Sequence, residues 1–301
     1  MKSKLKIGLT GSTGFVGMRL SKKFLMNNLK FYSYGRKNNP YAEKNIEFNL
    51  SKELNKECKE SLKDIDVFIH MASKTPSKNG EELNLKDFLS INVLGTEEII
   101  KNCLKANVKE FIYISSANLL KPIQGIVSEN SAYGDCVQSP YYLSSKISAE
   151  IIVKSFQCES MNIKIIRPSS IYGYGMQDGL IKIFLNKIFS NEKIKIYGKG
   201  KWGSDLVYVE DVVNSIYSLI FKDFSGPINI GSGKITTTKE IAFILCKAFN
   251  RSNSLISFDE NIKELNSLPI INIKMAEELI KFKPIKFENG IELMIKDFLN
   301  K

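Results

Sequence analysis

Histidine and tryptophan are nearly absent from this sequence, and cysteine is sparse. The 301 residues include one histidine, one tryptophan and five cysteines, with no C-x-x-C pair. Such a composition does not supply the clustered ligands of a zinc site, and an odd number of widely spaced cysteines does not form a disulfide framework. We therefore expect a chain without a metal that works in a reducing compartment, the cytoplasm.

Long apolar runs and clusters of like charge are also missing. No segment approaches the roughly 18 to 20 continuous apolar residues of a membrane span, and the N-terminal MKSKLKIGLT lacks an apolar stretch of signal-peptide length. The net charge is +11, but the lysines are spread along the whole chain. We interpret them as a solvated surface and expect neither a membrane nor a nucleic-acid partner. An alternative is a basic field that attracts anionic small molecules such as nucleotides.

What the sequence does have is a regular alternation of strand-like and helical patterns. Five runs read as strands: residues 5–9, 31–34, 66–71, 110–115 and 163–167. Between them, segments such as 95–107 and 141–156 place apolar residues three and four apart. This alternation predicts an α/β fold with a doubly wound parallel sheet of the Rossmann type, whose ligands bind at the carboxyl ends of the strands.

The second part of the chain is less regular. Glycine-rich loops precede a helix expected from Glu210, a strand at 227–231, and a helix opened by Thr237 with Glu240 in a capping-box pattern. We predict a Rossmann domain over residues 1–168 and a smaller substrate-binding α/β lobe mainly over residues 169–301. The two are interleaved, with segments near 205–234 returning to the first domain.

Three glycines lie where the first predicted strand turns into a helix. The stretch T-G-S-T-G-F-V-G places Gly11, Gly14 and Gly17 three residues apart. Glycine lets the backbone approach a pyrophosphate closely, and the free N–H groups and dipole of the helix start receive its charge. We predict a dinucleotide at this turn, with a purely structural turn as the alternative.

A tyrosine and a lysine are paired by helical spacing in SPYYLSSKISAE. Tyr142 and Lys146 are four residues apart, so both side chains share one helix face. Pro140 suits the first turn of this helix, and Ser139 is a candidate cap. A neighbouring ammonium stabilises a phenolate, so we expect Lys146 to lower the pKa of Tyr142 from its ordinary value of about 10.

These two motifs together resemble the short-chain dehydrogenase/reductase superfamily, and further segments resemble its extended branch of nucleotide-sugar epimerases, dehydratases and reductases. The matching segments follow in order: FIHMAS (68–73), INVLGT (91–96), SS (115–116), IIRPSSIYGYG (165–175), DLVYVEDVV (205–213) and INIGSGK (228–234). The resemblance covers nearly the entire chain. It implies a catalytic triad of Ser116, Tyr142 and Lys146.

The resemblance also implies binding residues. Cofactor contacts are expected from Gly11, Thr13, Gly14, Phe15, Val16, Gly17, Arg19, Arg36, Asn49, Leu50, Met71, Ala72, Ser73, Asn92, Ile114, Tyr142, Lys146, Arg167 and Pro168. Substrate contacts are expected from Ser73, Ser116, Ala117, Asn118, Ser169, Ser170, Lys199, Lys201 and Ser204. His70 is assigned a packing or hydrogen-bonding role, because the triad already provides the acid and base. Trp202 either covers a ligand or fills a loop.

The end of the second predicted strand bears on the choice of cofactor. An acidic residue there accepts from the ribose of NAD, whereas arginine accommodates the 2′-phosphate of NADP. The stretch YSYGRKNN contains no acid, and Arg36 and Lys37 follow directly. We expect Arg19 to complete a two-cation clamp on this phosphate. The sequence therefore favours NADP(H), with NAD(H) as the alternative, and Asn49 stands where the family usually has an aspartate near the adenine.

Departures from the family pattern reduce the number of reactions that the chain is expected to catalyse. Dehydratases of the family carry Asp-Glu after the catalytic serine, where this chain has Ala117 and Asn118, so a 4,6-dehydration is disfavoured. We predict NADPH-dependent reduction of a nucleotide-linked 4-keto sugar in carbohydrate biosynthesis. The alternatives are an NAD-dependent nucleotide-sugar 4-epimerase, an enzyme acting on a non-sugar ketone or aldehyde, and a non-catalytic nucleotide-binding regulator. The intact triad argues against the regulator.

Two substrate positions also depart from the pattern. Ser170 and Ser204 replace an asparagine and an arginine that hold the sugar nucleotide in the family, and Lys199 and Lys201 are candidates to replace the lost cation. Residues 119–121, LLK, replace the V-Y-G that usually follows the serine pair. The resemblance further implies a homodimer formed through the helices at roughly 89–105 and 141–156.

Overall fold

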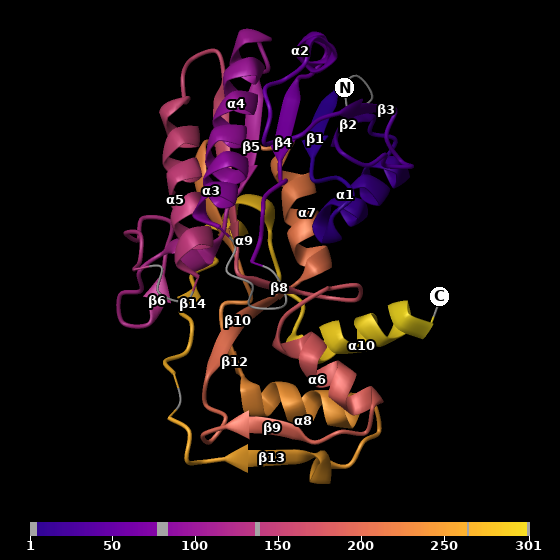
Figure 1. Cartoon of the computed structure of the whole chain (residues 1–301), viewed down its shortest axis with the longest axis vertical. Coiled ribbons are helices and arrows are strands. Elements are labelled where there is room, and N and C mark those ends of the chain that lie inside the picture. The colour runs from indigo at the N-terminus through magenta and orange to yellow at the C-terminus, as the bar shows by residue number, and fades with distance from the viewer. Residues whose placement is uncertain (1–4, 77–83, 136–138, 264, 300–301) are drawn as a thin grey trace. The chain divides into compact units, whose positions relative to one another are not determined.

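The structure of the protein is a computed structural model that describes residues 5–76, 84–135, 139–263 and 265–299. The chain forms two compact units, whose elements are labelled in Figure 1. Unit 1 is made of residues 1–121, 132–167 and 213–228, and unit 2 is made of residues 122–131, 168–212 and 229–301.

Unit 1 is built on a seven-stranded sheet with the order β11-β7-β5-β4-β1-β2-β3. The strands are β1 (Ile7–Thr10), β2 (Phe31–Gly35), β3 (Lys44–Glu47), β4 (Val67–His70), β5 (Glu110–Ile114), β7 (Asn162–Pro168) and β11 (Gly226–Ile230). Neighbouring strands from β3 to β7 are parallel. The order reverses direction between β1 and β4, as in Rossmann sheets. The predicted doubly wound α/β fold is therefore confirmed.

All five strands predicted in the first 170 residues of the chain are present, with ends shifted by at most two residues. β3 was not predicted. It is the edge strand next to β2, and only Ile46 of its four residues is buried. A strand that buries a single side chain lacks the apolar alternation by which strands are recognised in a sequence.

Helices cover both faces of this sheet (Figure 1). On one face, α2 (Lys56–Leu62), α4 (Gly95–Lys105) and α5 (Pro140–Ser155) share a hydrophobic cluster with Tyr34, Phe68 and Phe111. On the other face, Phe24 of α1 (Phe15–Met26) packs its ring against Phe31 of β2 and Tyr217 of α7 (Val209–Leu219). A short helix α3 (Leu85–Phe88) continues through a π-helical turn, η2 (Leu89–Leu94), into α4. After β5, the 3₁₀ turn η3 spans Ala117–Leu119.

Unit 2 contains smaller sheets. β12 (Ile235–Thr237), β10 (Gly203–Tyr208) and β8 (Ser170–Tyr172) form one, β9 (Ile194–Tyr197) pairs with β13 (Ile256–Asp259), and β6 (Ile126–Val127) pairs with β14 (Ile270–Ile271). The helical elements are α6 (Leu180–Phe189), α8 (Thr238–Ala248), η4 (Asn253–Leu255), α9 (Lys274–Ile280) and α10 (Phe287–Leu299). The predicted capping box is confirmed, because Thr237 and Glu240 hydrogen-bond each other at the start of α8. α7 is the helix expected from Glu210, and β11 is the strand expected at 227–231.

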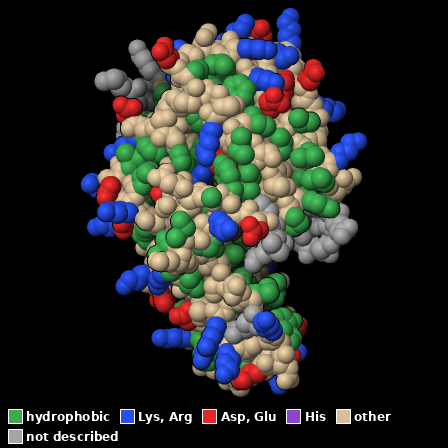
Figure 2. Space-filling view, turned by 90° about the vertical axis from the view of Figure 1, so that its left-hand side faces the viewer, with side chains coloured by type: hydrophobic (Ala, Val, Ile, Leu, Met, Phe, Trp, Pro, Cys, Tyr) green, Lys and Arg blue, Asp and Glu red, His purple; other side chains and the backbone are tan. Residues whose placement is uncertain are grey.

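Basic side chains are interspersed with other types on one face of the molecule. On the face drawn in Figure 2, lysine and arginine side chains alternate with acidic and apolar ones. Within the part of the chain that the structure describes, no helix is both long and apolar enough to cross a membrane. In the same residues, no group of three or more His, Cys, Asp or Glu side chains is placed to hold a metal ion.

Candidate active site

The glycine turn between β1 and α1 is shaped by two close approaches of the backbone. Gly11 has a φ of 70°, and the Gly14 N–H donates to the Gly11 carbonyl over 3.0 Å. A Cβ on Gly17 would lie 2.0 Å from the Gly11 oxygen, so a side chain there would force the helix off the turn. Gly14 stands at the helix start, where no side chain caps α1. The first N–H groups of α1 therefore point toward the turn as an anion-binding end.

A cavity of about 430 Å³ opens beside this turn, entirely within unit 1. Eight of the predicted cofactor residues line it: Gly11, Thr13, Gly14, Arg36, Asn49, Leu50, Ala72 and Ser73. Further lining residues were not predicted as contacts: Ser12, Tyr34, Gly35, Lys37, Phe48, Lys74 and Ile91. Its volume lies in the range of ordinary small-molecule sites. A basic end at Arg36 and Lys37 and an apolar wall at Phe48 and Leu50 suit the ribose, phosphate and adenine groups of a dinucleotide.

The loop that carries Arg36 is held to the glycine turn by buried Asn39. Its side-chain amide donates to the Ser12 carbonyl and to Ser21 Oγ, each over 2.9 Å. The Asn39 N–H donates to Asn45 Oδ1 over 2.7 Å, which closes the loop on the β3 side. The sequence gives no local signal for this role, because the partners lie 18 and 27 residues away.

Arg19 differs from the expectation. Its guanidinium donates to the Phe15 carbonyl over 3.0 Å and lies 4.7 Å from the centre of the Phe15 ring. Arg19 is not among the residues that line the cavity, whereas Arg36 and Lys37 both are. The cations that line the cavity are Arg36 and Lys37, from the loop after β2, and Lys74, which follows β4, in place of the predicted pair of Arg19 and Arg36. An i,i+4 contact on its own helix holds Arg19 in place.

His70, at the end of β4, is buried and hydrogen-bonded on both ring nitrogens. Nδ1 lies 2.8 Å from Thr10 Oγ1, and Nε2 lies 3.0 Å from Thr96 Oγ1. The Thr96 hydroxyl donates to the Asn92 carbonyl, so it accepts from His70, and Nε2 carries the proton. Burial and then the charge of Lys146 lower the pKa of His70 to about 3. The predicted packing and hydrogen-bonding role agrees with this geometry.

Tyr142 and Lys146 lie on α5, which begins at Pro140 as predicted. Ser139 occupies the N-cap position, but its side chain makes no capping hydrogen bond, contrary to expectation. The Lys146 ammonium donates to the Ile114 carbonyl over 2.7 Å and lies 4.3 Å from the centre of the Tyr113 ring. Burial lowers the pKa of Lys146 to about 7, although the charge of Glu150 opposes this shift.

The pKa of Tyr142 moves in the opposite direction to the one predicted. Burial raises it to about 12, and the ring packs edge-on against Phe88, with 6.3 Å between ring centres. The expected lowering by Lys146 is not found, and burial sets the shift because desolvation disfavours the phenolate. Tyr142 is consequently a protonated phenol at neutral pH, suited to donate a proton.

Ser116 follows β5 and caps the 3₁₀ turn η3. Its hydroxyl oxygen accepts from the Asn118 N–H over 3.2 Å, which leaves the hydroxyl hydrogen available to a substrate oxygen. Ser116 and Asn118 are half-buried, whereas Ala117 is buried beneath the turn. The preceding Ser115 is buried, and its hydroxyl donates to Glu150 Oε2 over 2.5 Å.

Two predicted cofactor residues have their side chains engaged elsewhere. Arg167, only 1% exposed, forms a buried ion pair with Glu150. The Asn92 amide accepts from the Lys74 N–H over 2.6 Å and donates to the Lys74 carbonyl and to Ser145 Oγ. Both side chains therefore tie elements of unit 1 together instead of lining the cavity. Glu150 lies one turn after Lys146 on the same helix and was not predicted from the sequence.

Other predicted contacts lie around these groups. Phe15 and Val16 begin α1, Gly17 is buried beneath the turn, Met71 follows β4, and Ile114 presents its carbonyl to Lys146. The remaining predicted contacts belong to unit 2: Pro168, Ser169, Ser170, Lys199, Lys201 and Ser204. Of these, Ser169 donates to Asp205, and Ser204 is buried in β10. Lys199 and Lys201 have exposed side chains.

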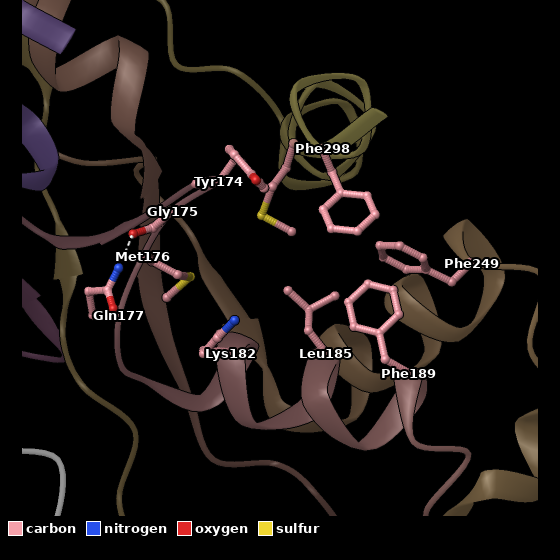
Figure 3. A pocket seen from close by; sticks show the side chains of 11 residues that line it. Tyr174, Gly175, Met176, Gln177, Lys182, Leu185, Phe189, Phe249 and Phe298 are labelled. Atoms are coloured by element: carbon pink, nitrogen blue, oxygen red, sulfur yellow. Dashed lines mark hydrogen bonds between the residues drawn. The ribbon is translucent and has the colours of Figure 1, made fainter. Parts of the chain in front are cut away.

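Unit 2 has a cavity of its own, of about 210 Å³ (Figure 3). Three phenylalanine rings form its apolar end, with Phe189 stacked on Phe298 and edge-on to Phe249. Gln177 and Lys182 lie toward the other end in Figure 3, and the Gln177 amide donates to the Gly175 carbonyl over 3.1 Å. Trp202 does not line this cavity, and its indole nitrogen is buried.

Known proteins resemble the chain over nearly its full length. A putative UDP-glucose 4-epimerase of Methanocaldococcus jannaschii is 30% identical, over 95% of this chain and 96% of the relative. The dTDP-4-dehydro-6-deoxyglucose reductase of Escherichia coli is 26% identical, over 96% of both chains. The solved structure of MoeE5 in complex with UDP-glucose and NAD has the same fold, with a TM-score of 0.82 at 22% identity and 97% of each chain covered. A family model matches residues 7–231, and the chain belongs to the family it describes, the NAD dependent epimerase/dehydratase family of enzymes.

Proposed function

We propose that the protein reduces a nucleotide-linked 4-keto sugar with NADPH. The observation that carries the proposal is the basic end of the unit 1 cavity, where Arg36 and Lys37 follow β2 and no acidic side chain is among the lining residues. A ribose 2′-phosphate brings negative charge that arginine binds through two parallel hydrogen bonds. A carboxylate at the same place would repel that phosphate.

The protonation state of Tyr142 supports reduction as the direction of reaction. When bound, the nicotinamide supplies a hydride to the carbonyl carbon and NADPH becomes NADP⁺. Tyr142 transfers its proton to the carbonyl oxygen, which becomes the alcohol, and Ser116 holds that oxygen through its hydroxyl hydrogen. A phenol whose pKa burial raises to about 12 is a weak acid, but it is protonated at neutral pH and less basic as phenolate than the alkoxide that hydride transfer creates, and it regains its proton from solvent afterwards.

Lys146 and the glycine turn complete the assignment. The ammonium of Lys146 stabilises the Tyr142 phenolate that remains after proton transfer, and it holds the nicotinamide ribose. Gly11, Gly14 and the start of α1 would hold the pyrophosphate. The substrate is a nucleotide sugar, in keeping with the named substrate of the Escherichia coli relative, a dTDP-linked 4-dehydro sugar.

A second candidate function is an NAD-dependent 4-epimerase. It is favoured by the 30% identity to the Methanocaldococcus relative, which is named a putative UDP-glucose 4-epimerase. Epimerisation needs the same three side chains, but Tyr142 must first act as a base. That role requires the bound cofactor to lower the pKa of Tyr142 far below the value of about 12 set by burial.

We also infer that the protein is a homodimer that associates through α5 and the π-helical turn η2. Four large apolar side chains of these elements are exposed: Leu89 by 41%, Leu94 by 59%, Tyr141 by 43% and Ile151 by 52%. Covering them with a second copy would remove apolar surface from water.

The first experiment identifies the nucleotide released when freshly purified protein is denatured, and then measures the affinity of cofactor-free protein for NADPH and NADH by calorimetry. We expect empty protein that prefers NADPH. In Arg36→Ala, binding of NADPH should weaken by about 10- to 100-fold with little effect on NADH. Arg19→Ala is the matched control and should retain the preference, because Arg19 is engaged with Phe15. Tightly held NAD in the purified protein would instead support the epimerase.

Turnover is measured with two probes. Oxidation of NADPH in the presence of dTDP-4-dehydro-6-deoxyglucose tests the reductase, and interconversion of UDP-glucose and UDP-galactose with NAD tests the epimerase. Activity with the first probe alone supports the proposal. Activity with the second alone would overturn it in favour of the epimerase, and cofactor binding without turnover of either probe would refute the proposed function.

A further inference from the structure

Glu150 is a fully buried carboxylate in the middle of α5 that the reaction itself does not use. It lies one helical turn beyond Lys146 and two turns beyond Tyr142, so the three side chains share one side of the helix. Four polar side chains bind this carboxylate, all of them in unit 1: Ser115, Tyr133, Lys154 and Arg167.

Two of these contacts lead to the catalytic serine from opposite directions. Ser115 precedes Ser116 in the chain and donates to Glu150 Oε2 over 2.5 Å. Tyr133 donates to Glu150 Oε1 over 3.0 Å and forms a β-bridge with Leu120, just after the turn that Ser116 caps. The Gly134 N–H donates to the Leu119 carbonyl over 2.7 Å, which strengthens this link. Glu150 thus holds the segment on both sides of Ser116 against α5.

The charge of Glu150 is fixed by its surroundings. Burial alone would raise its pKa, but the hydrogen bonds and charge of Arg167, the Ser115 hydroxyl and Lys154 outweigh burial and lower it. Arg167 is 1% exposed and donates through Nε to both carboxylate oxygens over 3.2 Å. A buried guanidinium and a buried carboxylate each need the other, because either one alone would be an uncompensated charge.

From this geometry we propose that Glu150 is a positioning residue, which fixes the Ser116 turn relative to Tyr142 and Lys146. The inference rests on the proposed function, since it assigns Ser116, Tyr142 and Lys146 to the reaction. Arg167 and Ser115 act through Glu150 and do not touch the cofactor.

Lys146 has several titratable and charged neighbours. They are Tyr113 on β5, His70 on β4, and Tyr142 and Glu150 on α5, with Arg167 of β7 bound to Glu150. Of these, Glu150 is the neighbour whose charge raises the pKa of Lys146, against the lowering caused by burial. Removing that charge should make Lys146 lose its proton at a lower pH.

β5 and β7 also contain a second buried ion pair, at the end of the sheet away from Ser115 and Arg167, which can serve as a control. Lys164 on β7 is fully buried and pairs with Glu110 at the start of β5 over 2.6 Å. Its ammonium also donates to the Leu219 and Lys222 carbonyls at the end of α7. Lys164 lies on β7, the strand that also carries Arg167. Glu110→Gln therefore removes the carboxylate partner of a buried cation on that strand, but away from Tyr142 and Lys146.

The experiment compares Glu150→Gln, Glu150→Asp and Glu110→Gln in the full chain, at a temperature where circular dichroism shows each to be folded. The substrate is whichever of the two probes the parent protein turns over. We expect Glu150→Gln to lower kcat by about 10- to 100-fold, as expected for misplaced catalytic groups, with the Kd for NADPH within threefold of the parent. As pH rises, the activity of Glu150→Gln should also be lost at a pH about one unit lower than in the parent. The reason is that Lys146 loses its proton more readily once the opposite charge nearby is removed.

Glu150→Asp keeps the charge and should restore the parent's pH profile, and Glu110→Gln should change stability without changing kcat or the profile. Equal behaviour of Glu150→Gln and Glu110→Gln would overturn the inference. If Glu150→Gln does not fold, Ser115→Ala and Tyr133→Phe replace it in the experiment, because both leave the ion pair of Glu150 and Arg167 intact. Each should lower kcat about threefold or more. An unchanged kcat in both variants would also overturn the inference. An inactive parent would refute the proposed function instead.

Discussion

At the scale of single residues, burial decides which protonated forms the candidate active site holds. It raises the pKa of Tyr142 to about 12 and lowers that of Lys146 to about 7, because a desolvated side chain resists charge of either sign. The free protein therefore holds Tyr142 as an acid. The charge of Glu150 opposes this lowering of the Lys146 pKa.

Replacing Tyr142 by phenylalanine tests the acid directly. We expect kcat to fall by about 10² to 10⁴, the usual worth of a positioned proton donor, with affinity for NADPH unchanged by calorimetry. Tyr141→Phe is the matched control, since Tyr141 is 43% exposed on the same helix and has Ser145 four residues on in place of a lysine. Activity of Tyr142→Phe within tenfold of the parent would refute the acid role.

His70 makes a second residue-scale prediction, on stability. Its pKa in the folded chain is lowered to about 3, below the ordinary 6.5, so between these values the unfolded chain binds a proton that the folded chain does not. Folding free energy is therefore lost as pH falls below 6.5, by up to about 1.4 kcal/mol per pH unit. Urea unfolding from pH 7 to 4 should show a shallower loss for His70→Gln than for the parent, and parallel curves would contradict the assignment.

At the scale of elements, the N-cap residues of two helices, both predicted from the sequence, differ in whether they make a capping hydrogen bond. Thr237 and Glu240 form a complete capping box at α8, whereas Ser139 at α5 makes no capping hydrogen bond. The capping box is a contact between residues three apart and so can be read from local sequence. Whether a lone serine caps a helix depends on the direction in which the preceding chain arrives, which is set by the rest of the fold.

This contrast predicts different costs for two similar substitutions. Thr237→Ala should lower the free energy of unfolding by about 1 kcal/mol, because it leaves a helix N–H group without its partner. Ser139→Ala should change it much less, because no hydrogen bond is lost. Chemical denaturation of both variants decides the matter, and equal losses would show that Ser139 caps α5 in solution.

At the scale of the whole molecule, the question is whether two copies associate. Leu94→Lys and Ile151→Lys place charges on the exposed apolar surface of η2 and α5, and we expect each to convert a dimer into monomers in light scattering. Ile183→Lys on α6 is the matched control, because Ile183 is also 52% exposed. A monomeric parent, or a parent dimer that survives both substitutions, would count against association through this surface.

The sequence by itself determined the fold class, the five central strands, the glycine turn and the helix that carries Tyr142 and Lys146. These features rest on spacings within one element or across one turn, where backbone geometry alone relates the residues. Only the tertiary structure decided that Asn39 holds the Arg36 loop, that Arg19 turns to Phe15, and that Glu150 collects Ser115, Tyr133 and Arg167. Most of those contacts join residues 17 to 35 positions apart on separate elements, so they exist only once packing has brought the elements together and burial has set their charges.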